Sequence, residues 1–282
     1  MVITVVGLGL IGGSLVRRLR GFNNAEIYGV DIDEATLNLA LNDGVIDKAF
    51  TDGAEAVESA DFVVLCLYPE QNVEFVRENA HIFKKGCVIT DVSGVKSFII
   101  ENIRESLPQD VHFIGGHPMA GRETGGYKSS TDTLFNGASY IITPPKTASA
   151  DAVKLVRDMA EYIGCDHVVT TSPEEHDAMI AYTSQLMHVV AVALCDSPLL
   201  ERSKYFSAGS LRDCTRIALI NAKMWSELFL ENKDALCDRI DEFKKSLDDI
   251  KNAIEENERE ELEGILSRAC ERKQKWLSET VK

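Results

Sequence analysis

A glycine-rich turn near the amino terminus constrains the fold more than any other feature of this chain. Gly7-Leu8-Gly9-Leu10-Ile11-Gly12 directly follows an apolar, β-branched run at residues 2–6 and opens a stretch of helical composition. In a strand–turn–helix unit of this kind the first glycine permits a tight turn, the second leaves the backbone open to a ligand, and the third lets helix and strand pack closely. The chain is therefore expected to begin with a βαβ unit.

Short apolar runs alternate with helical segments through the first half of the chain. The expected strands are residues 2–6, 26–30, 62–67, 87–91, 112–115, 139–143 and about 166–170, and the expected helices are 10–20, 34–41, 70–80 and 96–106. Continuous apolar character without alternation is typical of parallel strands that are buried on both faces. We therefore expect an α/β fold, with a Rossmann-type doubly wound sheet forming a domain over residues 1–170.

The second half of the chain has the composition of an all-helical domain. Ser172, Pro173 and two following glutamates form a helix start, and residues 179–194 are apolar nearly all round, which predicts a buried helix. Farther on, six apolar residues recur at alternating spacings of four and three: Leu236, Ile240, Phe243, Leu247, Ile250 and Ile254. Such a seam packs against another long helix, in the same chain or in a partner subunit. We predict a helical C-terminal domain over residues 171–282, in which the seam serves packing within the chain or the formation of a homodimer.

The charge and the cysteines exclude several classes of protein. A net charge of −15 argues against nucleic-acid binding, which selects for basic surfaces. Seven scattered cysteines without a C-x-x-C pair indicate free thiols in a reducing compartment. The first strand begins at Val2, which leaves no room for a signal peptide, and no run reaches the roughly 18 apolar residues of a membrane span. We expect a cytoplasmic protein with no nucleic-acid or membrane partner.

The glycine turn and Asp31 together predict a dinucleotide site. Asp31 ends the second expected strand, 19 residues after Gly12. A helix that begins at the turn can bind a pyrophosphate, and a carboxylate in this place accepts hydrogen bonds from the adenosine ribose. Asp33 adds a second negative charge and no arginine follows at once, which disfavours the extra phosphate of NADP. Residues 7–12 with Asp31 therefore predict an NAD site.

A second glycine-rich stretch, residues 115–121, is expected to form a loop that frames His117. A neutral imidazole accepts a proton near pH 7 and is the usual general base for a hydroxyl group. From this stretch alone, a turn that happens to contain a histidine is an equal alternative. The following residues 119–137 are long, polar and glycine-containing, which is typical of a functional loop. His117 is thus the candidate base to act beside the predicted cofactor.

Six motifs, in order along nearly the whole chain, resemble the prephenate dehydrogenase family. They are VVGLGLIGGSL at 5–15, DVSGVK at 91–96, GGHPMAGRE at 115–123, LFNGASYIITP at 134–144, TSQLMH at 183–188 and LRDCTRIA at 211–218. The family includes the arogenate and cyclohexadienyl dehydrogenases of tyrosine biosynthesis. The resemblance implies oxidation of a cyclohexadienol with loss of carbon dioxide, giving 4-hydroxyphenylpyruvate from prephenate or tyrosine from arogenate.

The resemblance also implies roles for single residues. His117 would deprotonate the ring hydroxyl while hydride leaves the same carbon. Arg216 would bind a substrate carboxylate, with Asp213 on the same helical face orienting its guanidinium group. Many members have G-S-V-K where this chain has Ser93-Gly94-Val95-Lys96, so the serine that helps to hold the substrate hydroxyl is displaced by one residue. Ser93 either serves in its place or leaves that contact missing.

Three further residues match the family at the far side of the expected site. His188 would contact the substrate side chain, and is associated with the use of prephenate. Glu123 would gate access, and Trp225 lies in a segment that reaches the neighbouring subunit's active site. Without the resemblance, a buried histidine and a core tryptophan would be the ordinary interpretations of His188 and Trp225.

Other functions are compatible with parts of the pattern. An arogenate-preferring or dual cyclohexadienyl dehydrogenase has the same motifs. A β-hydroxyacid dehydrogenase has the same two-domain plan, but is expected to carry a catalytic lysine in its helical domain. A non-catalytic NAD-sensing module would bind NADH and dimerise without turning over prephenate.

Overall fold

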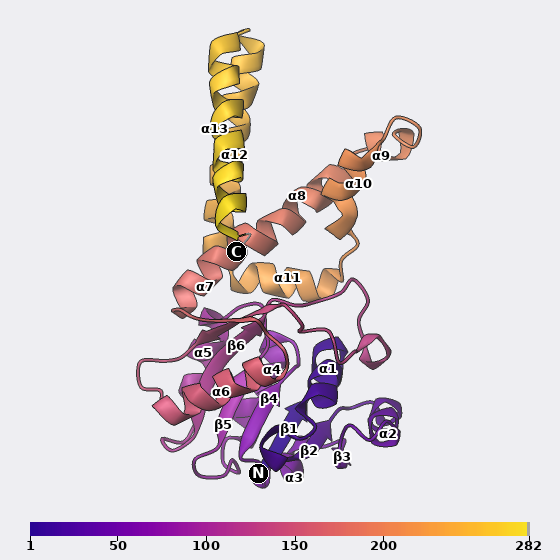
Figure 1. Ribbon diagram of the computed structural model, residues 1–282, viewed down its shortest axis with the longest axis vertical. Helices are drawn as coiled ribbons and strands as arrows, with labels where there is room; N and C mark the ends of the chain where they lie inside the picture. Colours follow the sequence, from indigo (N-terminus) through magenta and orange to yellow (C-terminus); the bar gives the residue numbers. More distant parts are fainter. Residues whose placement is uncertain (281–282) are drawn as a thin grey trace. The chain divides into compact units, whose positions relative to one another are not determined.

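An eight-stranded sheet organises the first part of the chain in the computed structural model, which describes residues 1–280 (Figure 1). In spatial order the strands are β3 (Lys48–Phe50), β2 (Glu26–Val30), β1 (Val2–Val6), β4 (Phe62–Leu65), β5 (Val88–Asp91), β6 (His112–Pro118), β7 (Ser139–Thr143) and β8 (His167–Thr170). All neighbouring pairs are parallel except β6 and β7. The predicted α/β fold is confirmed, and its strand order reverses between β1 and β4.

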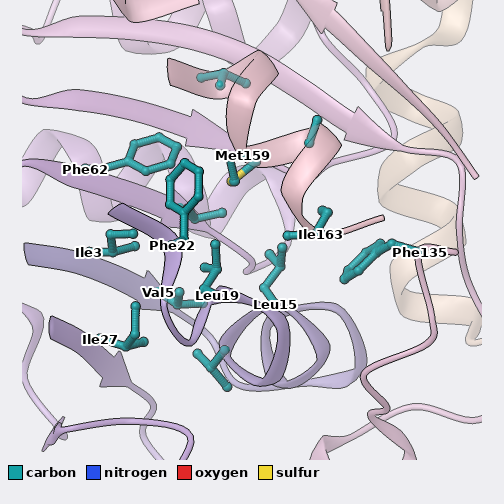
Figure 2. Close-up of a cluster of buried hydrophobic side chains, with 14 of the residues drawn as sticks. Ile3, Val5, Leu15, Leu19, Phe22, Ile27, Phe62, Phe135, Met159 and Ile163 are labelled. Carbon is teal, nitrogen blue, oxygen red and sulfur yellow. The ribbon is translucent and has the colours of Figure 1, made fainter. Parts of the chain in front are cut away.

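Helices cover both faces of this sheet and enclose two hydrophobic cores. The first core lies under α1 (Leu10–Leu19), α2 (Glu34–Asn42) and α6 (Ala150–Tyr162), and Figure 2 shows part of it. The second core lies under α3 (Gly53–Glu58), α4 (Pro69–Asn79) and α5 (Ser97–Arg104). In β4, Phe62 and Val64 enter the first core while Val63 and Leu65 enter the second. Burial on both faces is therefore the reason for the continuous apolar runs, since each such side chain contributes about 1.5–3 kcal/mol.

The sheet departs from the sequence prediction in two places. The short elements β3 and α3 were not predicted, because three and six residues are too few to give a periodic signal. His117 was expected in a loop, and this expectation is wrong, because Gly115–Pro118 pairs antiparallel with β7. The glycines permit the pairing: a Cβ atom on Gly116 would lie 2.3 Å from the Tyr140 hydroxyl oxygen.

The helices that follow the sheet begin as predicted. Ser172 caps α7 (Pro173–Ile180) by accepting a hydrogen bond from the backbone N–H of Glu175. A π-helical turn, Ala181–Gln185, leads into α8 (Leu186–Cys195). The remaining helices of this part are α9 (Leu199–Arg202), α10 (Gly209–Thr215) and α11 (Ala222–Glu231).

The apolar segment Pro173–Cys195 corrects two expectations. Only 28% of an apolar stretch of 18 residues within it is buried in the chain, so the predicted burial of residues 179–194 is wrong for a single subunit. Within the described residues it is also the one helical segment with the length and hydropathy of a membrane span, although none was expected. Length and composition are weak criteria, because core helices of other proteins meet them too.

The chain divides into two compact units, residues 1–233 and 234–282. The second unit comprises α12 (Lys233–Glu255) from its second residue and α13 (Arg259–Thr280), which are joined by a turn with Asn257 at φ 57°. Of the predicted seam, Leu236 is buried whereas Leu247 and Ile254 are exposed. The predicted domain boundary at residue 170 does not coincide with this division and stays a prediction.

Candidate active site

A cavity of about 1070 Å³ opens at the carboxyl end of the parallel strands. Its walls are the start of α1, the loops that follow β4 and β5, and residues 117–126. The helices α7, α8 and α11 and residues 216–221 before α11 complete them. Doubly wound sheets bind their ligands outside the carboxyl ends of the strands, where the strand order reverses. The cavity occupies this position.

The glycine turn forms one end of the cavity. Gly7 has φ 90°, and a Cβ atom there would lie 2.9 Å from the carbonyl oxygen of Cys66. A Cβ atom on Gly12 would lie 1.9 Å from the Gly7 carbonyl oxygen, whereas one on Gly9 would meet nothing within 4 Å. Gly9 is also the N-cap of α1, and no side chain in the described part of the chain caps this helix. Uncapped N–H groups beside open space fit a pyrophosphate.

Asp31 lies at the end of β2, where a ribose would be recognised. Its Oδ2 accepts a hydrogen bond from Leu8 N at 2.8 Å, and its Oδ1 accepts one from Asp33 N at 2.9 Å. Asp33 in turn caps α2, and hydrogen bonds from Thr36 and Ala35 lower its pKa. The carboxylate of Asp31 therefore holds the glycine turn, and Asp33 adds a second carboxylate beside it. A nucleotide with an additional phosphate is disfavoured at this place.

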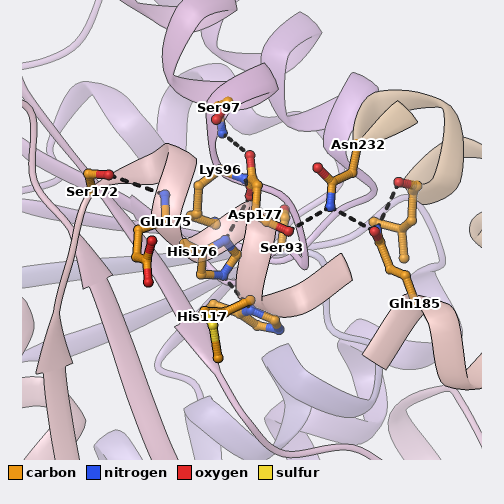
Figure 3. A network of polar contacts seen from close by, with 12 residues as sticks. Ser93, Lys96, Ser97, His117, Ser172, Glu175, His176, Asp177, Gln185 and Asn232 are labelled. Carbon is orange, nitrogen blue, oxygen red and sulfur yellow. Dashed lines mark hydrogen bonds and ion pairs between the residues drawn. The ribbon is translucent and has the colours of Figure 1, made fainter. Parts of the chain in front are cut away.

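His117 is the first member of a chain of three side chains (Figure 3). Its Nδ1 lies 2.9 Å from Nε2 of His176, and Nδ1 of His176 lies 2.7 Å from Oδ1 of Asp177. An ionised carboxylate can only accept, so His176 donates from Nδ1 and accepts at Nε2 from the Nδ1–H of His117. This arrangement fixes the tautomer of His117 and leaves its Nε2 with a free lone pair.

Asp177 is itself held by the start of α5. Its two carboxylate oxygens accept hydrogen bonds from the backbone N–H groups of Lys96 and Ser97, each at 2.8 Å. Burial opposes ionisation, but hydrogen bonds from His176 and Ser97 outweigh it, and the pKa of Asp177 is lowered. Asp177 is therefore the ionised anchor of the three side chains.

Both imidazoles are held in the neutral form. Burial lowers the pKa of His117 well below 6.5, and the neighbouring His176 and Lys96 act in the same direction. Burial also lowers the pKa of His176, although Asp177 partly opposes this effect. At neutral pH the three side chains therefore carry a single negative charge, on Asp177, and His117 is ready to accept a proton.

A buried ion pair holds the peptide that precedes His117. Lys96 and Asp91 are both completely inaccessible to solvent and are bonded to each other. Lys96 Nζ also donates to the carbonyl oxygen of Gly116 at 2.7 Å, and Asp91 Oδ1 accepts from Gly116 N at 3.1 Å. Both polar groups of Gly116 are thus fixed, and with them the position of the next residue.

Ser93 lines the cavity, but its hydroxyl group is already engaged. Ser93 Oγ lies 3.0 Å from Nδ2 of the buried Asn72, which donates to it. The next position faces the base more directly, since a Cβ atom on Gly94 would lie 4.0 Å from His117 Nε2. The one-residue displacement of the serine therefore moves its side chain toward Asn72.

The opposite wall contains most of the other predicted residues. His188 donates from Nδ1 to the carbonyl oxygen of Ile217 at 3.0 Å, and its ring lies 3.7 Å from that of Trp225 between centroids. Arg216 Nη1 lies 2.8 Å from Oε1 of Glu123, and both side chains are largely exposed. All four predicted residues line the cavity, and Trp225 lines the cavity of its own chain.

Asp213 does not lie where the sequence suggested. Its Oδ1 is 3.7 Å from Nε of Arg212, it is not among the residues that line the cavity, and Arg216 pairs with Glu123 instead. The helix α10 ends at Thr215, and Arg216 begins a 3-10 turn, so the three-residue spacing does not keep the two side chains on one face. The expectation that Asp213 orients Arg216 is wrong for this structure.

His176, Asp177, Lys96 and Asn72 were missed in the sequence. All four are buried polar residues, and each contacts a segment distant in the chain. The only local signal is that His176 and Asp177 lie one turn after the Ser172 cap, at the start of a helix. Their role depends on which segments pack together, which the sequence pattern does not reveal.

A dinucleotide cradle and a neutral histidine base in one cavity define a dehydrogenase of the Rossmann class. Residues 14–169 match the family described as "Prephenate dehydrogenase, nucleotide-binding domain", and residues 172–268 match "Prephenate dehydrogenase, dimerization domain". The chain belongs to the prephenate dehydrogenase family, whose members are NAD-dependent oxidoreductases.

Individual relatives agree with this assignment. Prephenate dehydrogenase of Bacillus subtilis is 34% identical over 92% of this chain and 72% of its own length. Cyclohexadienyl dehydrogenase of Zymomonas mobilis is 32% identical over 89% of this chain and 88% of its own. A crystal structure of prephenate dehydrogenase from A. aeolicus, in complex with hydroxyphenyl propionate and NAD+, is 34% identical and has a TM-score of 0.89, covering 98% of each chain.

Proposed function

We propose that this protein catalyses the NAD-dependent oxidative decarboxylation of prephenate to 4-hydroxyphenylpyruvate, a step of tyrosine biosynthesis. The observation that carries the proposal is the tautomer of His117, whose Nε2 is left as a proton acceptor by His176 and Asp177. The relatives named prephenate dehydrogenase, at 31–34% identity, support the choice of substrate.

The residues divide the reaction between them. His117 Nε2 accepts the proton of the ring hydroxyl, and NAD accepts hydride from the same ring carbon. The ring carboxylate then leaves as carbon dioxide, its bonding electrons aromatise the ring, and the proton returns from His117 to the phenolate oxygen. Because the base is partly buried and its partners His176 and Asp177 are buried, little solvent reorganises as the proton moves.

The cofactor is proposed to bind along the first edge of the cavity. Residues 7–12 would hold the pyrophosphate through the N–H groups at the start of α1, and Asp31 would accept hydrogen bonds from the ribose. The two carboxylates at the end of β2 favour NAD over NADP. NAD in the similar A. aeolicus structure supports this assignment.

The substrate is proposed to lie between His117 and the opposite wall. Arg216 would bind a substrate carboxylate through its guanidinium group, either in place of Glu123 or together with it. Glu123 would gate access to the cavity. His188 and Trp225 would contact the substrate side chain. Ser93 would contact the substrate from the cavity wall that it lines.

Arogenate is a second candidate substrate, and one observation favours it. Because His188 donates from Nδ1 to a carbonyl oxygen, the neutral ring has only an acceptor left at Nε2. Burial lowers the pKa of His188, which favours the neutral ring. An acceptor at this position suits the ammonium group of arogenate, whereas the side-chain keto group of prephenate requires a protonated His188.

A homodimer is proposed for the assembly. The family domain that matches residues 172–268 is named for dimerization. Large apolar side chains on the helices of this region are exposed in the single chain: Met179, Tyr182, Met187, Leu194, Leu199, Tyr205 and Phe206. A partner that covers them would also explain the apolar segment Pro173–Cys195 without a membrane, and a cytoplasmic location accords with the family's biosynthetic role.

One assay tests these proposals together. The purified protein is mixed with prephenate or arogenate, each with NAD or NADP, and the absorbance of the reduced cofactor is followed. We expect the highest kcat/KM for prephenate with NAD. A higher kcat/KM for arogenate would make arogenate the substrate in place of prephenate. Turnover of a β-hydroxyacid alone would refute both substrates. Binding of NADH with no turnover of any substrate would leave a cofactor-sensing module as the function.

A further inference from the structure

Few formal charges line the cavity that contains His117. Among its lining residues, all within residues 1–280, three are charged at neutral pH: Arg122, Glu123 and Arg216. Glu123 lies 2.8 Å from Arg216, so these two charges offset each other. Arg122 has no hydrogen bond or ion pair with another residue of the described range, and its side chain is exposed. It supplies the net positive charge of the cavity.

The substrate of the proposed function, on which this inference rests, carries two carboxylates. Both are attached through the ring carbon opposite the hydroxyl group, one directly and one at the end of the pyruvyl side chain. When His117 holds the hydroxyl, both carboxylates lie at the far end of the cavity. A chain with a net charge of −15 attracts a dianion only through local cations, and one guanidinium shared with Glu123 is insufficient for two carboxylates.

We infer that Arg122 binds the second carboxylate of the substrate. Its guanidinium group can form two parallel charge-assisted hydrogen bonds with a carboxylate. It lies five residues after His117 and directly before Glu123, so the loop that follows the base at the end of β6 carries the cation. Substrate bound to Arg122 and Arg216 pairs each of its carboxylates with one guanidinium group, and Glu123 is the lining carboxylate that must then move away from Arg216 or share it.

The pyrophosphate of the cofactor is the competing anion for Arg122. It already has a binding site in the uncapped N-terminus of α1, where Gly9 leaves the backbone open. The second substrate carboxylate, by contrast, has no other permanent cation among the lining residues of the described chain. The distribution of charge therefore assigns Arg122 to the substrate.

The test compares Arg122→Gln with Arg122→Lys. We expect Arg122→Gln to raise KM for prephenate at least tenfold, the equivalent of about 1.4 kcal/mol, with kcat within about twofold and KM for NAD unchanged. Arg122→Lys keeps the positive charge but loses the paired hydrogen-bond donors of the guanidinium group, so its KM for prephenate should lie between those of the wild type and Arg122→Gln. The matched control is Arg104→Gln, which removes the same charge from an exposed position at the end of α5 and should leave KM unchanged.

Direct binding separates this inference from the proposed function. Quenching of Trp225, which lines the cavity, reports the Kd of prephenate without turnover. Hydroxyphenyl propionate, which has a single carboxylate, identifies the group: equal weakening of both ligands assigns Arg122 to the side-chain carboxylate, and weakening of prephenate alone assigns it to the ring carboxylate. An unchanged Kd for prephenate, or a higher KM for NAD alone, overturns the inference. Wild-type protein that binds but does not oxidise prephenate refutes the proposed function only.

Discussion

At the scale of single residues, the chemistry depends on the direction of two hydrogen bonds. Asp177 can only accept, so His176 must donate to it, and His117 must donate to His176. A reversal of either bond would put a proton on His117 Nε2 and remove the acceptor from the cavity. The charge of Lys96 and the burial of the site then keep both rings neutral.

The pH dependence of turnover follows from the lowered pKa of His117. Protonation of Nε2 removes the base, so kcat/KM is expected to fall as the pH falls through this pKa, with the inflection below 6.5 because burial disfavours the charged ring. Initial rates measured from about pH 4.5 to 8 check the profile. His117→Asn should lower kcat about 100- to 10,000-fold and abolish the inflection. A flat profile in the wild-type protein would rule out His117 as the base.

Asp177→Asn tests the hydrogen-bond chain rather than the base. The amide has one acceptor oxygen where the carboxylate satisfies two backbone N–H groups and His176, so the tautomer of His176 is no longer fixed. We expect kcat to fall about 100-fold or more while KM for NAD changes little, as seen when a tautomer-fixing carboxylate is lost from a catalytic triad. A fall in NAD affinity that matches the fall in kcat would indicate damage to the fold instead.

At the scale of secondary structure elements, the site depends on where helices begin and end. Ser172 starts α7, and one turn later this helix presents His176 and Asp177 to the N-terminus of α5. The end of β6 brings His117 to them, because pairing with β7 extends the strand to Pro118. The hydrogen-bonded chain of His117, His176 and Asp177 therefore requires β6, α7 and the start of α5 to pack together.

The last turn of α11 contains a buried glutamate, Glu231, whose ionised form is unfavourable in the folded protein. Both oxygens of Glu231 are buried and have no hydrogen-bond partner among residues 1–280. Burial, together with Glu227 and Glu70, raises the pKa of Glu231 from 4.5 to about 8. The folded protein therefore holds a proton here that the unfolded chain has released. This contribution to stability is complete below pH 4.5 and is lost as the pH rises toward and through 8.

Glu231→Gln should remove this pH dependence. We expect the variant to melt at a higher temperature than the wild type above about pH 8, and at a similar temperature near pH 4.5. Differential scanning fluorimetry across this range measures the difference, and Glu78→Gln, an exposed position on α4, is the control. Equal melting temperatures for Glu231→Gln and the wild type at both ends would contradict the assigned proton.

At the scale of the whole molecule, the helical region contains more exposed apolar surface than a single chain requires. Exposed large apolar side chains that are concentrated in one region usually mark an interface. Leu194 on α8 is 43% exposed and Leu41 on α2 is 39% exposed, so the two leucines are matched in accessibility but lie in different parts of the chain.

Leu194→Glu should therefore weaken the proposed homodimer, whereas Leu41→Glu should not. A charge in the centre of an apolar interface costs its desolvation energy, and an exposed position on the nucleotide-binding part does not. Analytical ultracentrifugation over a range of concentrations gives the dissociation constant, which we expect to rise at least tenfold for Leu194→Glu alone. A wild-type protein that sediments as a monomer, or equal effects of both substitutions, would count against an interface on α8.

The sequence by itself determined the fold class, the first glycine turn and the position of His117 in the chain. These features are local: a buried parallel strand needs a continuous apolar run, and a tight turn needs glycine. Tertiary structure decided what surrounds His117. Packing of α7 against α5 places His176 and Asp177 beside His117. Pairing with β7 makes a strand of the residues around His117, where a loop was expected. The 3-10 turn at Arg216 gives Arg216 the partner Glu123 in place of Asp213. His117 and His176 lie 59 positions apart, and a hydrogen bond across such a separation leaves no periodic signal in the sequence, so only the folded chain reveals it.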